Sequence, residues 1–311
     1  MTWLLLAALG QFLNAVVAIL DKYIVSDEKA LPRPFVYAFY TCIITGGWIF
    51  VYLLGFIPGL AGIGAPSLTN VQSPSIQVVG MAFLAAYTFF IALVSMYDAL
   101  KHGDASDVMP VIGAIAAISS FAMTQLFFPG TLSPNFIYGI ALLSVGTLLV
   151  STGRFKGKTF VISIHSGIFF ALHLITMKAL FDETSFDDGF FWSRITFVAF
   201  ALSLLLVPAY WQKITQQTKD TSAKAGLLVF LTKVLAGVAA FLLLKATDLG
   251  EPSVIQATDG LKFVFILALG VIVGKFTPLS SGENDYRLKT IVRKLLYVAV
   301  ISIGFVILFL E

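Results

Sequence analysis

Apolar runs of about twenty residues alternate with short polar breaks along nearly the whole chain. A helix needs about 20 mostly apolar residues to cross a bilayer, and ten segments approximately meet that requirement. The breaks carry charged and turn-forming residues, and the weakest break is FFPGTLSP, between the fourth and fifth segments. The pattern predicts an all-α membrane protein with ten transmembrane helices. The predicted spans are 3–20, 35–57, 76–97, 107–128, 134–152, 159–180, 190–210, 225–246, 253–274 and 291–310.

The composition agrees with this prediction. Hydrophobic residues make up 58% of the chain and charged residues only 12%, whereas soluble domains carry about 25% charged residues. The first apolar run, MTWLLLAALGQF, has no basic segment before it and no small-residue cleavage site after it, so we expect a spanning helix rather than a signal peptide. The single cysteine, Cys42, excludes an intrachain disulfide and a cysteine-based metal site.

One sequence motif occurs twice in the chain. ALKHGDASDVMPVIG at 99–113 aligns with ATDLGEPSVIQATDG at 246–260, so that Gly103 corresponds to Gly250. The first copy joins spans 3 and 4, and the second joins spans 8 and 9. Gly can end the preceding helix, and the acidic residue and Ser that follow can cap the next one. We therefore expect the primary role of this motif to be structural.

Two further matches fall in the same order. DKYIVSDE resembles MKALFDET, which aligns Lys22 with Lys178, and ALLSVGTLLV resembles AVISIGFVIL, which aligns Gly146 with Gly304. Because a unit of five helices crosses the membrane an odd number of times, a second copy must be inverted, as in many secondary transporters. The sequence predicts two inverted five-helix repeats, 1–153 and 159–311. The alternative is chance similarity among Leu-, Ala- and Gly-rich helices.

Basic residues gather on one predicted side of the membrane. The opposite side has only Lys178 and Lys245, beside an acidic patch of Asp182, Glu183, Asp187 and Asp188. Cytoplasmic loops are enriched in Lys and Arg, so this distribution predicts that both termini lie outside. The fifteen basic residues after odd-numbered spans are Lys22, Lys29, Arg33, Lys101, Arg154, Lys156, Lys158, Lys213, Lys219, Lys224, Lys275, Arg287, Lys289, Arg293 and Lys294.

The chain resembles the EamA-like branch of the drug/metabolite transporter superfamily over essentially its whole length. The resemblance rests on the lysines that end spans 1 and 6, the G-[DE]-x-S entries to spans 4 and 9, the glycines in spans 5 and 10, and Asn14 and Asp21 in span 1. It implies ten helices in two repeats and solute transport. Family members often carry Glu at the ends of spans 4 and 9, Arg early in span 2, and cytoplasmic termini. This chain lacks those residues, and its charge distribution predicts the reverse orientation.

Ionisable residues inside spans usually face the bundle interior and mark a pathway. Lys233 lies about two turns into span 8 and either contacts an anionic or zwitterionic substrate or pairs with an acid of another helix; a misplaced span boundary is the third explanation. Asp259 and Lys262 share a helix face and either neutralise each other or line a cavity. Arg194 lies one turn into span 7, where it lines the cavity or reaches the interface.

Other polar positions give weaker indications of a functional role. Lys22 and Lys178 end their spans on opposite sides, either as snorkelling side chains or as two gates. His165 and His173 lie two turns apart on one face of span 6, where neighbouring helices or a cavity can satisfy them. Tyr37 lies near a span end and is expected in an interfacial aromatic belt.

No nucleophile, phosphate-loop or zinc-protease motif is present, so no enzyme activity, cofactor, metal site or nucleic-acid partner is expected.

Three functions fit these features. The first is a secondary transporter of small polar metabolites in a prokaryotic plasma membrane; in-span cations outnumber in-span acids three to one, which favours anionic or zwitterionic substrates. The second is a flippase for lipid-linked head groups, which predicts lateral grooves. The third is a membrane scaffold, which predicts a filled centre. Small-molecule substrates and membrane lipids are the expected partners.

Overall fold

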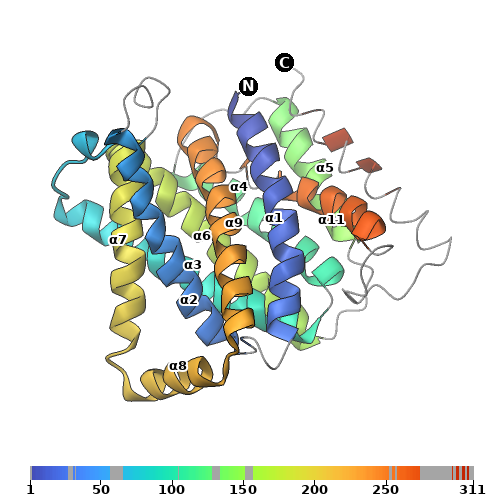
Figure 1. Cartoon of the computed structure of the whole chain (residues 1–311). Helices are drawn as coiled ribbons and strands as arrows, with labels where there is room; N and C mark the ends of the chain where they lie inside the picture. The colour runs from blue at the N-terminus through green and yellow to red at the C-terminus, as the bar shows by residue number, and fades with distance from the viewer. Residues whose placement is uncertain are drawn as a thin grey trace.

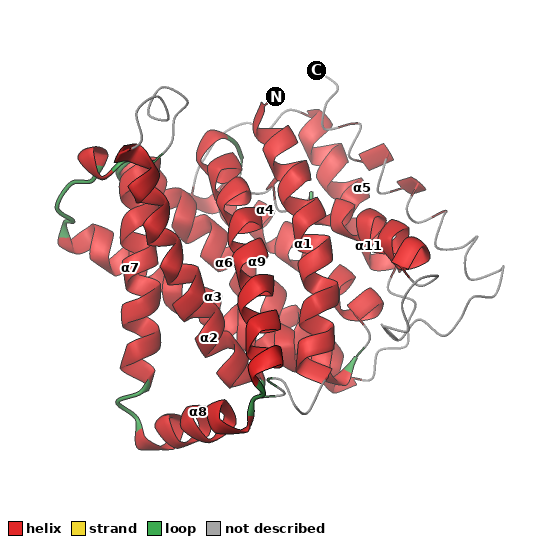
Figure 2. Ribbon diagram, in the orientation of Figure 1, coloured by secondary structure: helices red, strands yellow, loops and turns green. Residues whose placement is uncertain are grey.

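The computed structural model is helical throughout the residues that it describes. These are 2–26, 31, 33–56, 66–103, 105–127, 134–150, 157–251, 254–255, 258–273, 296, 299–300, 303–304 and 307. Figures 1 and 2 show the helices as one bundle. The α-helices are α1 (Thr2–Ser26), α2 (Pro34–Gly46), α3 (Ile76–His102), α4 (Ala105–Phe127), α5 (Pro134–Val150), α6 (Gly157–Glu183), α7 (Phe186–Leu204), α8 (Pro208–Asp220), α9 (Ala223–Leu249) and α11 (Asp259–Val273), and two 3₁₀ helices are η1 (Gly47–Phe56) and η3 (Leu68–Asn70).

Six helices are long and apolar enough to cross a membrane: Thr2–Ser26, Pro34–Leu53, Ile76–His102, Val108–Phe127, Gly157–Glu183 and Ala223–Leu249. A seventh span results if α7 and α8 are counted as one bent segment. Large apolar side chains cover their outer faces; Ile76 is 88% exposed and Leu126 is 76% exposed. The helical membrane class is therefore confirmed. The last predicted span, 291–310, lies largely outside the described residues.

Helix α8 occupies a segment that the sequence pattern assigned to a polar loop. Pro208 begins α8 at a position where its missing N–H costs nothing, and the axis turns by 100° from α7. The helix buries Ile214 and leaves Trp211 51% exposed, which is typical of a helix lying in the interface. Predicted span 7, at 190–210, was thus too long, because α7 ends at Leu204.

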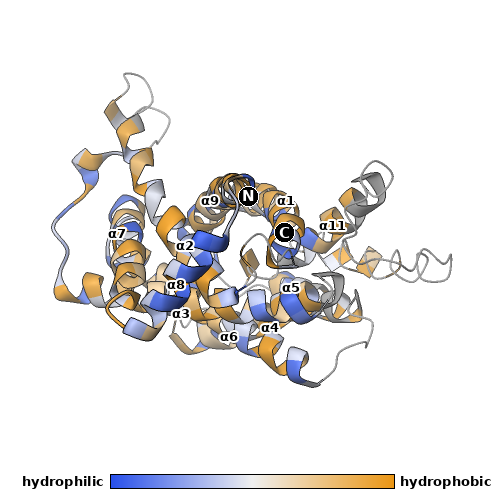
Figure 3. Ribbon diagram, turned by 60° about the horizontal axis from the view of Figure 1, so that its bottom comes forward, coloured by the Kyte–Doolittle hydropathy of each residue, from blue (hydrophilic) through white to orange (hydrophobic). Residues whose placement is uncertain are grey.

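The helices of the first half of the chain pack mainly against those of the second half. Helix α1 packs against α9 and α11, and α6 packs in the same way against α3 and α4. Figure 1 shows α1 beside α9, with α3, α4 and α6 grouped together. Figure 3 shows the bundle tilted by 60°, with polar segments collected on α8 and at helix ends. The centre of the molecule therefore lies between the two halves.

Glycines allow several of these crossings to be close. A Cβ atom on Gly10 of α1 would lie 2.8 Å from Leu243 of α9, and one on Gly167 of α6 would lie 2.7 Å from the carbonyl oxygen of Ile112 of α4. Small residues at helix contacts let backbones approach within a membrane. The packing of α1 on α9 and of α6 on α4 thus depends on small side chains at defined positions.

Adjacent glycines at the end of α2 provide a matched test of this packing. A Cβ on Gly46 would lie 2.2 Å from Val198 Cγ2 and 3.0 Å from the Arg194 carbonyl oxygen, whereas a Cβ on Gly47 would meet nothing within 4 Å. We expect Gly46→Ala to lower the free energy of unfolding by about 1–3 kcal/mol through overpacking, and Gly47→Ala to leave it unchanged or slightly raised. Thermal unfolding of the two purified variants measures the difference; equal stabilities would contradict the close α2–α7 crossing.

Candidate functional site

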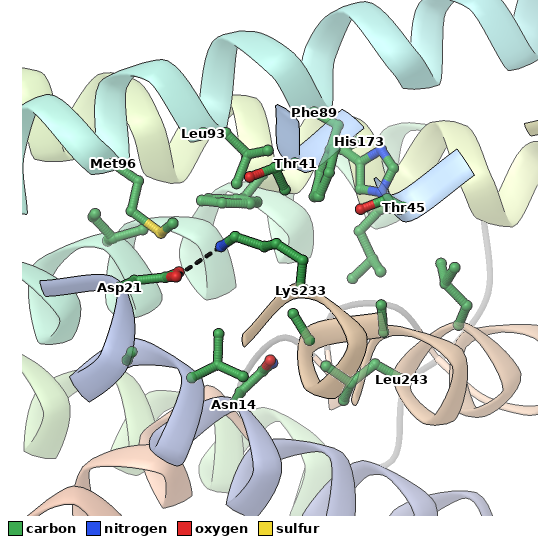
Figure 4. A pocket seen from close by; sticks show the side chains of 18 of the residues that line it. Asn14, Asp21, Thr41, Thr45, Phe89, Leu93, Met96, His173, Lys233 and Leu243 are labelled. Carbon is green, nitrogen blue, oxygen red and sulfur yellow. Dashed lines mark hydrogen bonds and ion pairs between the residues drawn. The ribbon is translucent and has the colours of Figure 1, made fainter. Parts of the chain in front are cut away.

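A cavity of about 200 Å³ lies at the centre of the bundle. Helices from both halves of the chain line it: α1, α2, α3 and α4 from the first, and α6, α7, α9 and α11 from the second. We call it the central pocket. Figure 4 shows its polar and apolar side chains converging from several helices. Its polar lining includes Gln11, Asn14, Asp21, Thr41, Thr45, Tyr97, His173, Arg194, Lys233 and Lys262.

Positions related by the sequence repeat line the central pocket together. The shift of 156 positions from Lys22 to Lys178 relates Asn14, Val17 and Ala18 of α1 to Phe170, His173 and Leu174 of α6, all in the lining. The shift of 147 positions from Gly103 to Gly250 relates Phe89, Leu93, Met96 and Tyr97 of α3 to Ala236, Ala240, Leu243 and Leu244 of α9, also all in the lining. Residues that these two sequence alignments pair therefore line the same cavity.

An ion pair between α1 and α9 lies in the wall of the pocket. Lys233 Nζ lies 2.7 Å from Asp21 Oδ1 and donates a second hydrogen bond, of 2.9 Å, to the Tyr97 hydroxyl. Lys233 is 1% exposed and Asp21 is 3% exposed. Of the sequence alternatives for Lys233, the structure shows the ion pair with an acid of another helix. Asp21, the partner, was named in the sequence only as part of the family resemblance.

Two tyrosines complete this cluster, which we call the Asp21–Lys233 cluster. The Tyr37 hydroxyl donates to Asp21 Oδ1 over 2.5 Å, and the Tyr37 ring lies 4.2 Å from Lys233 Nζ. The Tyr37 and Tyr97 rings are 4.3 Å apart, and Thr41 Oγ1 lies 3.2 Å from the Tyr97 hydroxyl. Tyr37 was expected at the membrane interface, but it is fully buried. The charges of the ion pair are thus surrounded by hydroxyl groups and ring faces.

Arg194 reaches the pocket from α7 instead of reaching the interface. The residue is 2% exposed, and its guanidinium carbon lies 4.7 Å from the Phe190 ring centre and 4.6 Å from that of Phe197. Its Nε and Nη2 atoms lie 3.4 and 3.3 Å from Ser193 Oγ. Among the described residues, no carboxylate lies within ion-pair distance of it. Each ring contact contributes about 0.5–2 kcal/mol, which is less than the several kcal/mol that burial of a charge costs.

The two histidines of α6 have different surroundings. His173 lines the pocket; its Nδ1 donates to the Ala85 carbonyl oxygen over 3.0 Å, and its ring lies 4.8 Å from that of Phe89. His165 is exposed, and its Nδ1 lies 2.8 Å from Ser95 Oγ. The structure therefore keeps His173 as a candidate site residue and leaves His165 outside the pocket.

Lys262 also lines the pocket, where it is 6% exposed and its Nζ lies 5.8 Å from the Phe263 ring centre. The Asp259 side chain lies outside the described part of the chain, so the predicted Asp259–Lys262 pair stays a prediction. Among the described residues, the charged side chains in the lining are one acid, Asp21, and three cations, Arg194, Lys233 and Lys262.

Lys22 and Lys178 bind the ends of helices rather than the pocket. Lys22 Nζ donates to the carbonyl oxygens of Leu100 and Gly103, at 2.7 and 2.9 Å, where α3 ends. Lys178 Nζ donates to the Asp248 carbonyl oxygen at 3.3 Å, where α9 ends, and lies 2.9 Å from the Asp182 carboxylate. A cation is favourable at the carbonyl end of a helix. Lys22 thus joins α1 to the end of α3, and Lys178 joins α6 to the end of α9.

The repeated glycines stand at these two helix ends. Gly103 and Gly250 follow α3 and α9 in extended conformations, so neither needs a left-handed backbone. A Cβ on Gly103 would lie 2.8 Å from Val108, and one on Gly250 would lie 2.6 Å from the Trp3 ring. Close packing at the turn therefore explains why both copies of the motif require Gly.

A second, polar pocket of about 1020 Å³ lies at the end of the bundle near Lys178. The segment 69–75 and the turn between α6 and α7 line it. Asn70 Nδ2 donates to Asp187 over 2.8 Å, and the Gln72 backbone N–H donates to Asp188 over 2.6 Å. The acidic patch predicted on this side thus holds the segment 69–75 against α7.

Comparisons with known proteins bear on the fold alone. No family model matches the chain, and no curated protein matches it. Solved structures do match, 28 chains in all. One of them, described as "Crystal structure of protein", has a TM-score of 0.61 at 12% sequence identity and covers 97% of this chain and 95% of its own. The arrangement of the helices therefore occurs in another protein, over nearly its whole length.

The Asp21–Lys233 pair predicts strongly coupled effects on stability. Lys233→Met leaves a buried carboxylate without its cation, and we expect a loss of about 3–5 kcal/mol in the free energy of unfolding. Asp21→Asn with Lys233→Met removes both charges and keeps an acceptor for Tyr37, so most of that loss should be recovered. Thermal unfolding of both single variants and the double variant gives the coupling energy. Additive losses would contradict the pair.

Proposed function

We propose that the chain is a secondary transporter of small polar metabolites, built on the EamA-like plan of two inverted five-helix repeats. The observation that carries the proposal is the central pocket, which repeat-related positions of both halves line together. In inverted-repeat transporters the substrate binds near the middle of the membrane, at the interface of the repeats. On this proposal the first repeat contains α1 to α5, and the second contains α6, α7, α9, α11 and the segment 291–310.

The helix packing supports the duplication. In a duplicated chain, α6 would correspond to α1, α9 to α3, and α11 to α4. The packing of α1 on α9 and α11 would then correspond to packing of α6 on α3 and α4. These contacts are present. Helix α8 has no counterpart in this scheme, and we assign it to the connection between the second and third helices of the second repeat.

The walls of the pocket suggest two different closures for alternating access. The Asp21–Lys233 cluster closes one end with charges and hydroxyl groups. The repeat shifts relate Asp21 to Met177 and Tyr97 to Leu244, which are buried in an apolar cluster with Phe181 and Phe190. We infer that rocking of the two halves opens the ionic closure on one side of the membrane and the apolar closure on the other.

The other two functions fit the structure less well. A scaffold predicts a filled centre, whereas a cavity of about 200 Å³ is present. A flippase for lipid-linked head groups predicts lateral grooves, whereas the central pocket draws its lining from helices of both halves. These features favour a dissolved solute as the substrate.

Transport by the reconstituted protein tests the proposal. Proteoliposomes are assayed for counterflow of radiolabelled anionic, zwitterionic, neutral and cationic metabolites, and we expect one chemical class to move. Lys233→Met should lower the rate per folded protein by at least about tenfold, because the ionic closure is lost and an unpaired charge remains in the pocket wall. Lys245→Met, on the same helix but outside the pocket, is the control and should transport normally. Absence of counterflow for every class would reject the proposed function.

We further propose that the chain lies in a prokaryotic plasma membrane with both termini outside. The exposed Thr69 lies at the end of the bundle near Lys178, whereas the exposed Lys219 lies on α8, at the opposite end. In a Cys42→Ser background, Thr69→Cys should react with a membrane-impermeant maleimide on intact cells. Lys219→Cys should react only after permeabilisation. The reverse pattern would show that the positive-inside distribution misassigns this chain.

A further inference from the structure

We propose that the central pocket binds a small organic anion with one carboxylate and an apolar body, and that Arg194 is the residue that binds the carboxylate. The inference rests on the proposed function, because it names the substrate class of the same pocket. It differs from one of the sequence alternatives for Lys233, in which that residue contacts an anionic or zwitterionic substrate.

Lys233 is a poor candidate because its charge is already compensated. Its Nζ lies 2.7 Å from the Asp21 carboxylate and 2.9 Å from the Tyr97 hydroxyl, and the Tyr37 ring lies over it. An anion at this position would have to displace a buried carboxylate from its partner. Binding there would therefore exchange one ion pair for another and leave Asp21 unpaired.

Arg194 has the opposite properties. A guanidinium carries five N–H donors in a planar fork that matches a carboxylate. The contacts of its nitrogens with described residues are the two long ones to the Ser193 hydroxyl, and no described carboxylate pairs with it. The charge is buried and lines the pocket. An anionic ligand would supply the negative charge that no described residue provides at ion-pair distance from Arg194.

Aromatic rings fix the direction from which a ligand must approach. Phe190 and Phe197 lie over the guanidinium, so its N–H edge is the part left for hydrogen bonds. The Phe197 ring lies 5.1 Å from that of Phe89 and 6.1 Å from that of His173. Figure 4 shows Phe89 and His173 together, away from the Asp21–Lys233 pair. A carboxylate bound to Arg194 would thus place the rest of the ligand near these rings.

The size and lining of the pocket limit the ligand body. The central pocket has a volume of about 200 Å³, which accommodates a compact ligand. Phe89, Leu93, Leu174 and Leu243 provide apolar walls. Arg194 is a buried cation of the lining with no described carboxylate at ion-pair distance, which favours a negative ligand over a neutral or positive one. The chemistry fits a compact aliphatic or aromatic carboxylate.

Matched pairs of acids and amides test the proposal on the purified full-length protein. The probes are benzoate with benzamide and hexanoate with hexanamide, which differ in charge but hardly in shape. We expect the carboxylates to raise the unfolding temperature in a concentration-dependent way, and the amides to leave it unchanged. The carboxylate shift should vanish in Arg194→Gln and persist in Arg33→Gln, which removes an exposed arginine outside the pocket.

Arg194→Lys provides a second test if Arg194→Gln does not fold. It keeps the positive charge but loses the fork, so the carboxylate should still bind, with an apparent Kd raised by at least about fivefold. Any of four results would overturn the proposal. The acids and amides could give equal shifts, or the unaltered protein could show no carboxylate shift. The shift could also persist in Arg194→Gln, or the Kd could be unchanged in Arg194→Lys.

The same probes separate this inference from the proposed function. If carboxylates bind through Arg194 but no solute crosses proteoliposomes, the anion site stands and the transport proposal fails. If a neutral or cationic solute is transported equally well by the unaltered protein and by Arg194→Gln, transport stands and the anion site fails.

Discussion

The ion pair between Asp21 and Lys233 constrains much of the rest of the structure. Two charges removed from water are tolerated only when they are held in good geometry with further hydrogen bonds. The pair therefore requires α1 and α9 to lie at one separation and in one register, which Gly10 permits by its contact with Leu243. Tyr37 and Tyr97 must then be buried beside the charges. In this way, one polar contact fixes the mutual positions of α1, α2, α3 and α9.

The residues that the sequence alignment of the two halves pairs near the central pocket differ in chemistry. Asp21 and Tyr97 both accept hydrogen bonds from Lys233, whereas Met177 and Leu244, with which the sequence alignment pairs them, pack in an apolar cluster. An ion pair is directional and loses its energy when one partner is displaced, whereas apolar packing tolerates small shifts without leaving a charge uncompensated. On the proposed mechanism, the two sides of the membrane would therefore open at different energetic cost.

Hydropathy predicted most of the described helices, because each spanning helix must satisfy its own backbone and present apolar side chains to lipid. It missed α8, because that helix is polar and amphipathic. It identified Lys233 as buried but could not identify its partner, since Asp21 lies 212 positions away and the contact depends on how α1 packs against α9. Tyr37 was assigned to the interface, and the interface was one of two alternatives for Arg194, because distance from a span end along the sequence does not give the direction of a side chain.

Lys22 and Lys178 indicate which parts of the molecule can move as units. Lys22 ties α1 to the end of α3, and Lys178 ties α6 to the end of α9. Both contacts lie within one half and use backbone carbonyls, which do not titrate. By contrast, the contacts of α1 with α9 and of α6 with α3 cross between the halves, and the Asp21–Lys233 pair is a directional contact among them that a rocking movement would separate. Rigid ties within each half and a displaceable ionic contact between them are what rocking of two halves around a shared pocket requires.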